Sequence, residues 1–211
     1  ECGSAAVTGT SRSCSAQDSG KSAEDQLAAA VRIVREFAPL EDIQDQARQT
    51  ILNFVAEHPD ALHRSCLEGH FTGSSWVVDH YATRGLILLH SKVNRWLQPG
   101  GHADGDGFLQ MVALREATEE TGIVGLEVWS DPIDIDVHLI EKRSAAEPAH
   151  LHLDVRYLVK APKGAVFRGN HESVALRWVG GDDLEDSTLS LDDSTKRVAR
   201  YGFALAERLL N

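Results

Sequence analysis

Three glutamates lie close together immediately after a glycine-rich loop. Glu116, Glu119 and Glu120 are spaced i, i+3 and i+4, so on an α-helix all three carboxylates project from one face. Gly100 and Gly101 in the preceding loop permit tight turns and leave backbone carbonyls uncovered by side chains. Carboxylates beside an exposed carbonyl form an all-oxygen site suited to Mg²⁺ or Mn²⁺. A solvated acidic face is the alternative, because like charges four residues apart repel by only about 0.2–0.5 kcal/mol.

Composition narrows the classes of partner. The chain has 211 residues, of which 42% are hydrophobic and 25% charged, and its formal net charge is -11. These values are typical of a folded domain with a hydrophobic core. The negative charge argues against binding a nucleic-acid polymer, because nothing would neutralise a run of phosphates. A small phosphate-containing substrate remains compatible with this charge if a divalent metal ion mediates the contact.

Cysteine usage and apolar segments say little about the cellular compartment. The three cysteines, Cys2, Cys14 and Cys66, are widely spaced and form no CxxC pair, so neither a disulfide framework nor a cysteine zinc site is supported. No apolar run approaches the roughly 20 residues that span a bilayer. We therefore expect a cytoplasmic protein without membrane association.

The first part of the chain predicts a tail and two helices. Residues 1–22 are small, polar and rich in serine and glycine, which predicts a flexible tail. Residues 23–68 are expected to form a helical hairpin that packs on the main domain or on a partner subunit, so a homodimer is possible. Ser22 and Asp25 have the spacing of a capping box at the start of the first helix. In the second helix the expected packing stripe is Ile43, Ala47, Ile51 and Phe54.

The remaining part, residues 69–211, mixes strands with helices. Apolar and alternating segments predict strands at 71–79, 85–91, 133–140, 150–162 and 175–180, and the alternation in 133–140 and 150–162 suggests that these two are half-exposed. Residues 108–121 predict a central helix that Gly122 ends, with Met111, Leu114, Thr118 and Thr121 facing the core. Residues 191–210 predict a closing helix. The fold class is therefore α/β (α+β) around a mixed sheet.

The central segment resembles a known family signature. Residues 101–123 are similar to the Nudix box, G-x5-E-x7-R-E-U-x-E-E-x-G-U, with Arg115, the three glutamates, Gly122 and Ile123 in their expected places. Ala117 is small for its aliphatic position. Gly107 stands where the family has a glutamate. The resemblance extends over roughly residues 69–211 and leaves the helical hairpin outside.

This resemblance implies a fold and an activity. Nudix domains are α/β/α sandwiches, and their enzymes hydrolyse a nucleoside diphosphate linked to another moiety by attack of water on phosphorus. By position, Glu116, Glu119 and Glu120 would bind Mg²⁺ or Mn²⁺, with the Gly100 carbonyl as a further ligand. Glu116 or Glu120 would also act as the base. Arg115 would orient the acids, and Glu172, in a late loop, is the position from which many of these enzymes supply a further ligand or base.

The departure at Gly107 leaves alternatives open. The missing glutamate is expected to support the box by pairing with Arg115, and Asp106 or Asp104 is near enough in sequence to replace it. A non-catalytic Nudix-fold ligand sensor is a second hypothesis. A diphosphate isomerase on the same scaffold is a third, weakened because such enzymes need a catalytic cysteine and none follows Cys66.

Three histidines form a separate candidate group. His150 and His152 point to one face of a predicted strand, and His102 follows the glycine pair. If they converge, they could bind zinc, although strand histidines are more often packed or hydrogen-bonded. Because His102 adjoins the metal loop, we expect it to contact a substrate phosphate.

Overall fold

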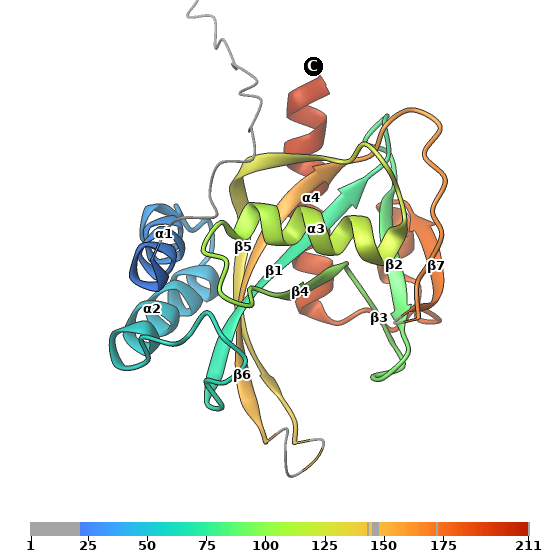
Figure 1. The fold of residues 1–211 in the computed structure, drawn as a ribbon. Coiled ribbons are helices and arrows are strands. Elements are labelled where there is room, and N and C mark those ends of the chain that lie inside the picture. Colours follow the sequence, from blue (N-terminus) through green and yellow to red (C-terminus); the bar gives the residue numbers. More distant parts are fainter. Residues whose placement is uncertain (1–21, 143, 145–147, 172, 211) are drawn as a thin grey trace, which may run out of the picture.

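The fold was determined as a computed structural model that describes residues 22–142, 144, 148–171 and 173–210 (Figure 1). The predicted tail falls outside this range apart from Ser22. The elements along the chain are α1 (Ala23–Glu36), α2 (Asp42–Glu57), β1 (Gly69–Val78), β2 (Gly85–His90), β3 (Arg95–Leu97), β4 (Gly100–His102), α3 (Leu109–Thr121), β5 (Glu127–Ile140), β6 (His150–Lys160), β7 (Ser173–Val179), the short 3-10 helix η1 (Asp182–Glu185) and α4 (Asp193–Leu210).

Seven strands form one mixed sheet. The main path runs β3-β2-β1-β6-β5, with β4 paired to β1 and β7 paired to β2. The β1–β6 pair is parallel and the other pairs are antiparallel. In the parallel pair, His70 lies opposite His152 and Thr72 opposite Asp154. The expected mixed sheet is therefore confirmed.

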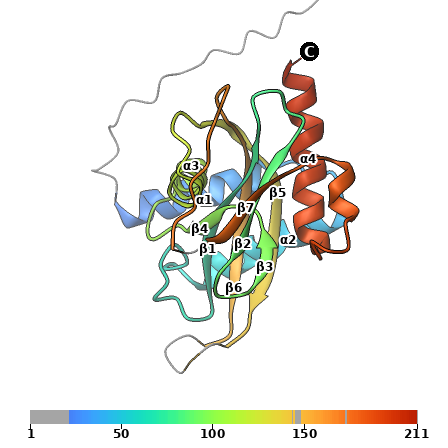
Figure 2. The same ribbon diagram turned by 90° about the vertical axis from the view of Figure 1, so that its right-hand side faces the viewer.

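Helices cover both faces of this sheet, with α3 on one face and α4 on the other (Figure 2). Successive residues of β1 alternate between the two layers, as the pleat requires. Val77 packs in the cluster that includes Ala117 of α3, whereas Trp76 packs in the cluster that includes Val198 of α4. This is the α/β/α sandwich that the resemblance to Nudix domains implies.

Helices α1 and α2 share a hydrophobic core with α3 and the sheet. Ala30 of α1 and Ile51 of α2 are fully buried in the same cluster as Val112 of α3. The predicted capping box is present, because the Asp25 N–H donates to Ser22 Oγ at 3.1 Å and the Ser22 N–H donates to Asp25 Oδ2 at 3.2 Å.

The packing stripe of α2 differs from the prediction at one position. Ala47 and Ile51 are buried as expected, but Ile43 is 47% exposed and its neighbour Gln44 is fully buried. Gln44 Nε2 donates to Asp134 Oδ1 of β5 at 2.9 Å. A buried amide with a carboxylate partner is stable, so the helix turns Gln44 inward and leaves Ile43 outside.

The inner face of α3 was predicted only in part, since Thr121 is buried and Leu114 packs against the core but the other two residues are exposed. Met111 is 39% exposed and Thr118 is exposed, and only Thr121 of the four predicted core residues is fully buried. The face toward the sheet consists instead of the apolar residues Leu109, Val112, Ala113 and Ala117. The alanines allow the helix to lie close to β1. Gly122 ends the helix with a φ of 65°, as predicted.

Strand β6 is buried on both faces, which corrects the expectation of a half-exposed strand. The alternating polar residues of this strand and of β5 form a buried ion-pair network rather than a solvated face. Arg156 donates to Asp154 at 2.6 Å, to Asp136 at 2.9 Å and to Asp134 at 3.0 Å. Alternation in the sequence does not distinguish solvated charges from charges that are paired inside the protein.

Among the helices of the described residues, none is long and apolar enough to cross a bilayer.

Candidate active site

One cavity lies between the C-terminal half of α3 and the sheet. Strand β1 pairs with β4 from Thr72 to Ser74, and then with β2 at Val77 and Val78. The cavity has a volume of about 810 Å³ and is lined by residues from β1, β2, β4, β6 and α3. Its size is within the range of small-molecule sites.

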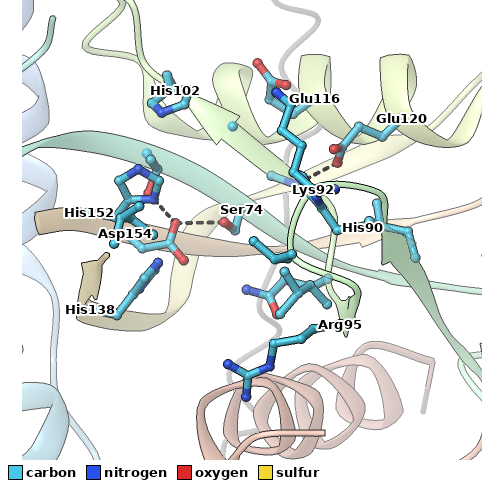
Figure 3. A pocket seen from close by; sticks show the side chains of 18 of the residues that line it. Ser74, His90, Lys92, Arg95, His102, Glu116, Glu120, His138, His152 and Asp154 are labelled. Carbon is cyan, nitrogen blue, oxygen red and sulfur yellow. Dashed lines mark hydrogen bonds between the residues drawn. The ribbon is translucent and has the colours of Figure 1, made fainter. Parts of the chain in front are cut away.

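The three box glutamates line this cavity, as does Gly100. Glu120 is only 3% exposed, and its Oε2 accepts a hydrogen bond of 2.9 Å from the Gly100 N–H. Glu116 has a side chain that is 17% exposed, whereas Glu119 is exposed. Figure 3 shows Glu116 and Glu120 reaching from α3 into the cavity. All three glutamates to which the sequence analysis points therefore line the same cavity.

Glycine at position 101 allows the close approach of the Glu116 side chain. A Cβ atom on residue 101 would overlap the Glu116 carboxylate. Arg115 Nη2 donates to Glu116 Oε1 at 2.9 Å and to the His102 carbonyl at 3.0 Å. The arginine thus links the loop of β4 to the first glutamate, which is the contact that an orienting role requires.

Neither of the aspartates suggested as a replacement acid pairs with Arg115. Asp106 Oδ1 instead accepts a hydrogen bond of 2.8 Å from the Phe108 N–H. Asp104 pairs with Arg64 at 2.7 Å. The contact of Asp106 has a local cause, because an aspartate two residues before a backbone N–H readily closes an Asx-type turn.

Helix α1 fills the space beside Gly107. The Gly107 N–H donates to Gln26 Oε1 at 2.9 Å, and a Cβ atom on residue 107 would overlap the Gln26 carbonyl oxygen. A glutamate at this position has no room, since the helix backbone is already there. The departure from the Nudix box therefore coincides with docking of the helical hairpin.

A second wall of the cavity was not predicted from the sequence. Asp154 of β6 is 1% exposed, and its Oδ1 accepts hydrogen bonds from Thr72 Oγ1 at 2.8 Å and Ser74 Oγ at 2.7 Å. The signal was present in the alternation of "HLHLDVR", which puts His152, Asp154 and Arg156 on one face of a strand. Identifying their partners required the register with β1.

His102 lines the cavity together with His138 and His152. Burial lowers the pKa of His102 to about 4, so its imidazole is neutral at neutral pH. It can exchange hydrogen bonds with a substrate but provides no positive charge for a phosphate. The expected phosphate contact of His102 therefore remains a prediction, restricted to a neutral ring.

Glu172 lies outside the described residues. The described part of its loop adjoins the end of α3, because Asn170 Nδ2 donates to the Glu119 carbonyl at 3.2 Å and the Arg168 N–H donates to the Thr121 carbonyl at 2.6 Å. Asn170 and His171 also line the cavity. The proposed role of Glu172 stays a prediction.

The residues at the end of α3 suit a hard divalent cation. The three glutamates of α3 line one cavity, and no cysteine does among the described residues. Oxygen donors of this kind are the preferred ligands of Mg²⁺ and Mn²⁺. The donor set thus fits the metal that the sequence resemblance implies.

Solved structures of similar fold include a hydrolase of the NUDIX family and an Ap4A hydrolase. Neither a protein-family model nor a curated protein sequence matches the chain. A hydrolase of the NUDIX family from Clostridium perfringens is 21% identical, with a TM-score of 0.50, over 65% of this chain and 97% of that one. An Ap4A hydrolase from C. elegans in a binary complex is 18% identical, with a TM-score of 0.53, over 65% of this chain and 98% of that one. This likeness shows that the chain has the Nudix fold.

Proposed function

We propose that this chain is a divalent-metal-dependent pyrophosphohydrolase. Its substrate would be a nucleoside diphosphate derivative, cleaved at the diphosphate linkage by attack of water on phosphorus. The observation that carries the proposal is that Glu116, Glu119 and Glu120 all line one cavity of about 810 Å³, beside Gly100. The Nudix fold, which the hydrolases described above share, supports the same conclusion.

Each box residue has a role in this proposal. Glu116, Glu119, Glu120 and the Gly100 carbonyl would hold Mg²⁺ or Mn²⁺, which supplies Lewis-acid stabilisation of the charge that develops on the phosphate oxygens. The hydrogen bond from the Gly100 N–H keeps the buried Glu120 carboxylate in one orientation. Arg115 fixes Glu116 through its 2.9 Å contact. Glu116, Glu120 or Glu172 would accept the proton of the attacking water.

The rest of the cavity can hold the remainder of the substrate. Lys92, Arg95 and Lys142 add positive charge to its lining, and in Figure 3 Arg95 lies across the cavity from Glu116. These cations would contact substrate phosphates, which offsets the repulsion expected from the acidic chain. The volume is sufficient for a nucleoside diphosphate joined to a further group.

The two alternative functions have less support. A diphosphate isomerase needs a cysteine in the pocket, but Cys66 is buried and does not line the cavity. A ligand sensor was suggested by Gly107 alone, and the docking of α1 beside Gly107 gives that residue a packing role. Glu116, Glu119 and Glu120, which metal-dependent hydrolysis would use and a sensor would not need, all line one cavity.

A substrate screen in labelled water tests this proposal. Dinucleoside polyphosphates, nucleoside diphosphate sugars and coenzyme A derivatives are incubated with the protein and Mg²⁺ or Mn²⁺ in H₂¹⁸O. Phosphorus NMR should detect ¹⁸O in one released phosphate group, because water attacks phosphorus. Chelation of the metal should stop the reaction. Binding of a compound without turnover under any metal condition would favour the sensor, and ¹⁸O found only on carbon would exclude attack on phosphorus.

A further inference from the structure

Five histidines gather beside the proposed catalytic cavity, although they come from distant parts of the chain. Four of them form a connected group of rings whose centroids lie 4.8–5.2 Å apart, His70, His102, His150 and His152. His138 joins through His152 at 5.3 Å. Strand pairing causes this arrangement, since His152 is opposite His70 in the parallel pair and opposite His138 in the antiparallel pair.

Three of the histidines have nitrogens close enough to share one ion. One ring nitrogen each of His70, His150 and His152 lies within 4.8 Å of the others. Nitrogens bound to a single tetrahedral Zn²⁺ at about 2.0–2.1 Å lie roughly 3.3 Å apart. Side-chain rotation of modest size therefore brings the group to metal-binding distance. His150 and His152 lie two residues apart on one strand and face the same side.

Hydrogen bonds orient two of these rings for ligation. His70 Nδ1 is 3.3 Å from the Cys66 carbonyl, and His150 Nδ1 is 2.8 Å from the Pro148 carbonyl. A carbonyl only accepts, so each Nδ1 carries the proton and each Nε2 presents a lone pair. A backbone carbonyl on the remote nitrogen is the usual support of a histidine that binds a metal.

Two of these three histidines have a ring nitrogen that is buried without a hydrogen-bond partner among the described residues. His70 is 4% exposed, and its Nε2 is buried without a hydrogen-bond partner among the described residues. His152 Nε2 is likewise buried without a hydrogen-bond partner among these residues. Leaving a buried polar atom unsatisfied is unfavourable, and a group of imidazoles with converging lone pairs is satisfied by one cation.

We propose that His70, His150 and His152 form a zinc site, separate from the carboxylate site of α3. Three imidazole nitrogens suit Zn²⁺ and are poor ligands for Mg²⁺, whereas the glutamates have the opposite preference. His152 also lines the catalytic cavity, so the ion would lie at the cavity wall.

The test measures zinc binding by the full chain while the carboxylate site of α3 is saturated with Mg²⁺. Metal-free protein in millimolar Mg²⁺ is titrated with Zn²⁺ by calorimetry, and with Co²⁺ by visible absorption as a probe of tetrahedral nitrogen coordination. We expect about one equivalent to bind and the melting temperature to rise, since a ligand specific to the folded state stabilises it. Absence of stoichiometric Zn²⁺ binding by the wild type would overturn the proposal without any variant being needed.

Variants locate the ion. His150→Gln and His152→Gln should each weaken Zn²⁺ binding by roughly 100-fold, because one of three protein ligands is lost. Glu120→Gln should leave Zn²⁺ binding unchanged while turnover is lost, so the two proposals fail separately. Cys66→Ser and His58→Gln control for the other group of possible ligands, His58, Cys66 and Glu68. Loss of binding in these controls, or its retention in a His150→Gln/His152→Gln double variant, would contradict the assignment.

Discussion

The side chain and the backbone of Gln26 both contact Gly107, which joins the N-terminal hairpin to the loop before α3. Gln26 Oε1 accepts a hydrogen bond of 2.9 Å from the Gly107 N–H, and the Gln26 carbonyl occupies the space into which a Cβ atom on residue 107 would project. The position at which the chain departs from the Nudix box is therefore a packing contact. We infer that a helix, rather than an acid, supports this part of the loop.

This contact predicts that Gly107→Ala lowers the free energy of unfolding by about 1–3 kcal/mol, the usual cost of overpacking against rigid atoms. The measurement is chemical denaturation of wild type and variant. Gly181→Ala is the matched control, because a Cβ atom there meets nothing within 4 Å and its φ of −58° suits alanine. It should be neutral or stabilising. Equal stability of Gly107→Ala and wild type would show that α1 does not dock as described.

Restoring the family residue by Gly107→Glu should for the same reason reduce stability rather than improve turnover. A charged side chain at this position must displace the backbone of α1. Thermal melting and initial rates measure the two effects. A variant with wild-type melting temperature and higher turnover would contradict this explanation.

The sequence was sufficient to predict α3 and its carboxylates because their spacing is local. Glu116, Glu119 and Glu120 share one helix, so the helical repeat alone places them together. The second wall of the cavity, around Asp154, could not be predicted from local spacing. Thr72 and Asp154 are 82 residues apart and meet only because β1 and β6 are parallel neighbours in a particular register.

Burial was also predicted poorly where polar residues were involved. Gln44 and Arg156 are buried because each has a carboxylate partner supplied by another element. Polar residue types in the sequence therefore suggested exposed positions, but in the fold these two side chains are buried. The same difficulty applies to Gly107, whose role depends on a helix 81 residues earlier in the chain.

The ion-pair network predicts a large loss of stability in Arg156→Met. Arg156 is 2% exposed and contacts three carboxylates, so its removal leaves Asp154 buried without its cation and leaves Asp134 and Asp136 with Arg197 alone. Breaking a buried pair in this way costs about 3–5 kcal/mol. Denaturant unfolding at neutral pH measures this effect.

Arg177→Met provides a comparison on the same sheet. Arg177 is an exposed partner of Asp183 at 3.8 Å, and such pairs contribute about 0–1 kcal/mol. If the two variants lose similar stability, the buried network is not the dominant interaction of Arg156.

Asp79 predicts a contribution to stability that depends on pH. Burial acts to raise the pKa of this carboxyl, but the N–H groups of Thr83 and Arg84 and the Arg84 guanidinium outweigh it, and the pKa falls below its ordinary value. Because the folded state holds the carboxylate more strongly than the unfolded state, the stabilisation is full above about pH 4 and is lost as pH falls through the folded pKa.

The check is Asp79→Asn, compared with wild type from pH 7 to pH 2. Hydrogen bonds to a charged group contribute about 1.5–3 kcal/mol, so the variant should be less stable by about this amount at neutral pH. The difference should shrink below about pH 4. A difference that stays constant over the whole range would indicate that the charge of Asp79 is not the stabilising feature.

The central claim is that the carboxylates of α3 hold a divalent ion needed for hydrolysis. Glu120→Gln tests it most directly, because the amide oxygen can still accept the hydrogen bond from the Gly100 N–H while the charge is removed. Glu127→Gln, at an exposed position outside the cavity, is the control. Turnover of the best substrate is measured at saturating Mg²⁺ and Mn²⁺, with melting temperature recorded for each protein. We predict that Glu120→Gln loses turnover by about 100-fold or more with the fold intact, while Glu127→Gln keeps wild-type rates. Near-normal turnover of Glu120→Gln at saturating metal would contradict the account.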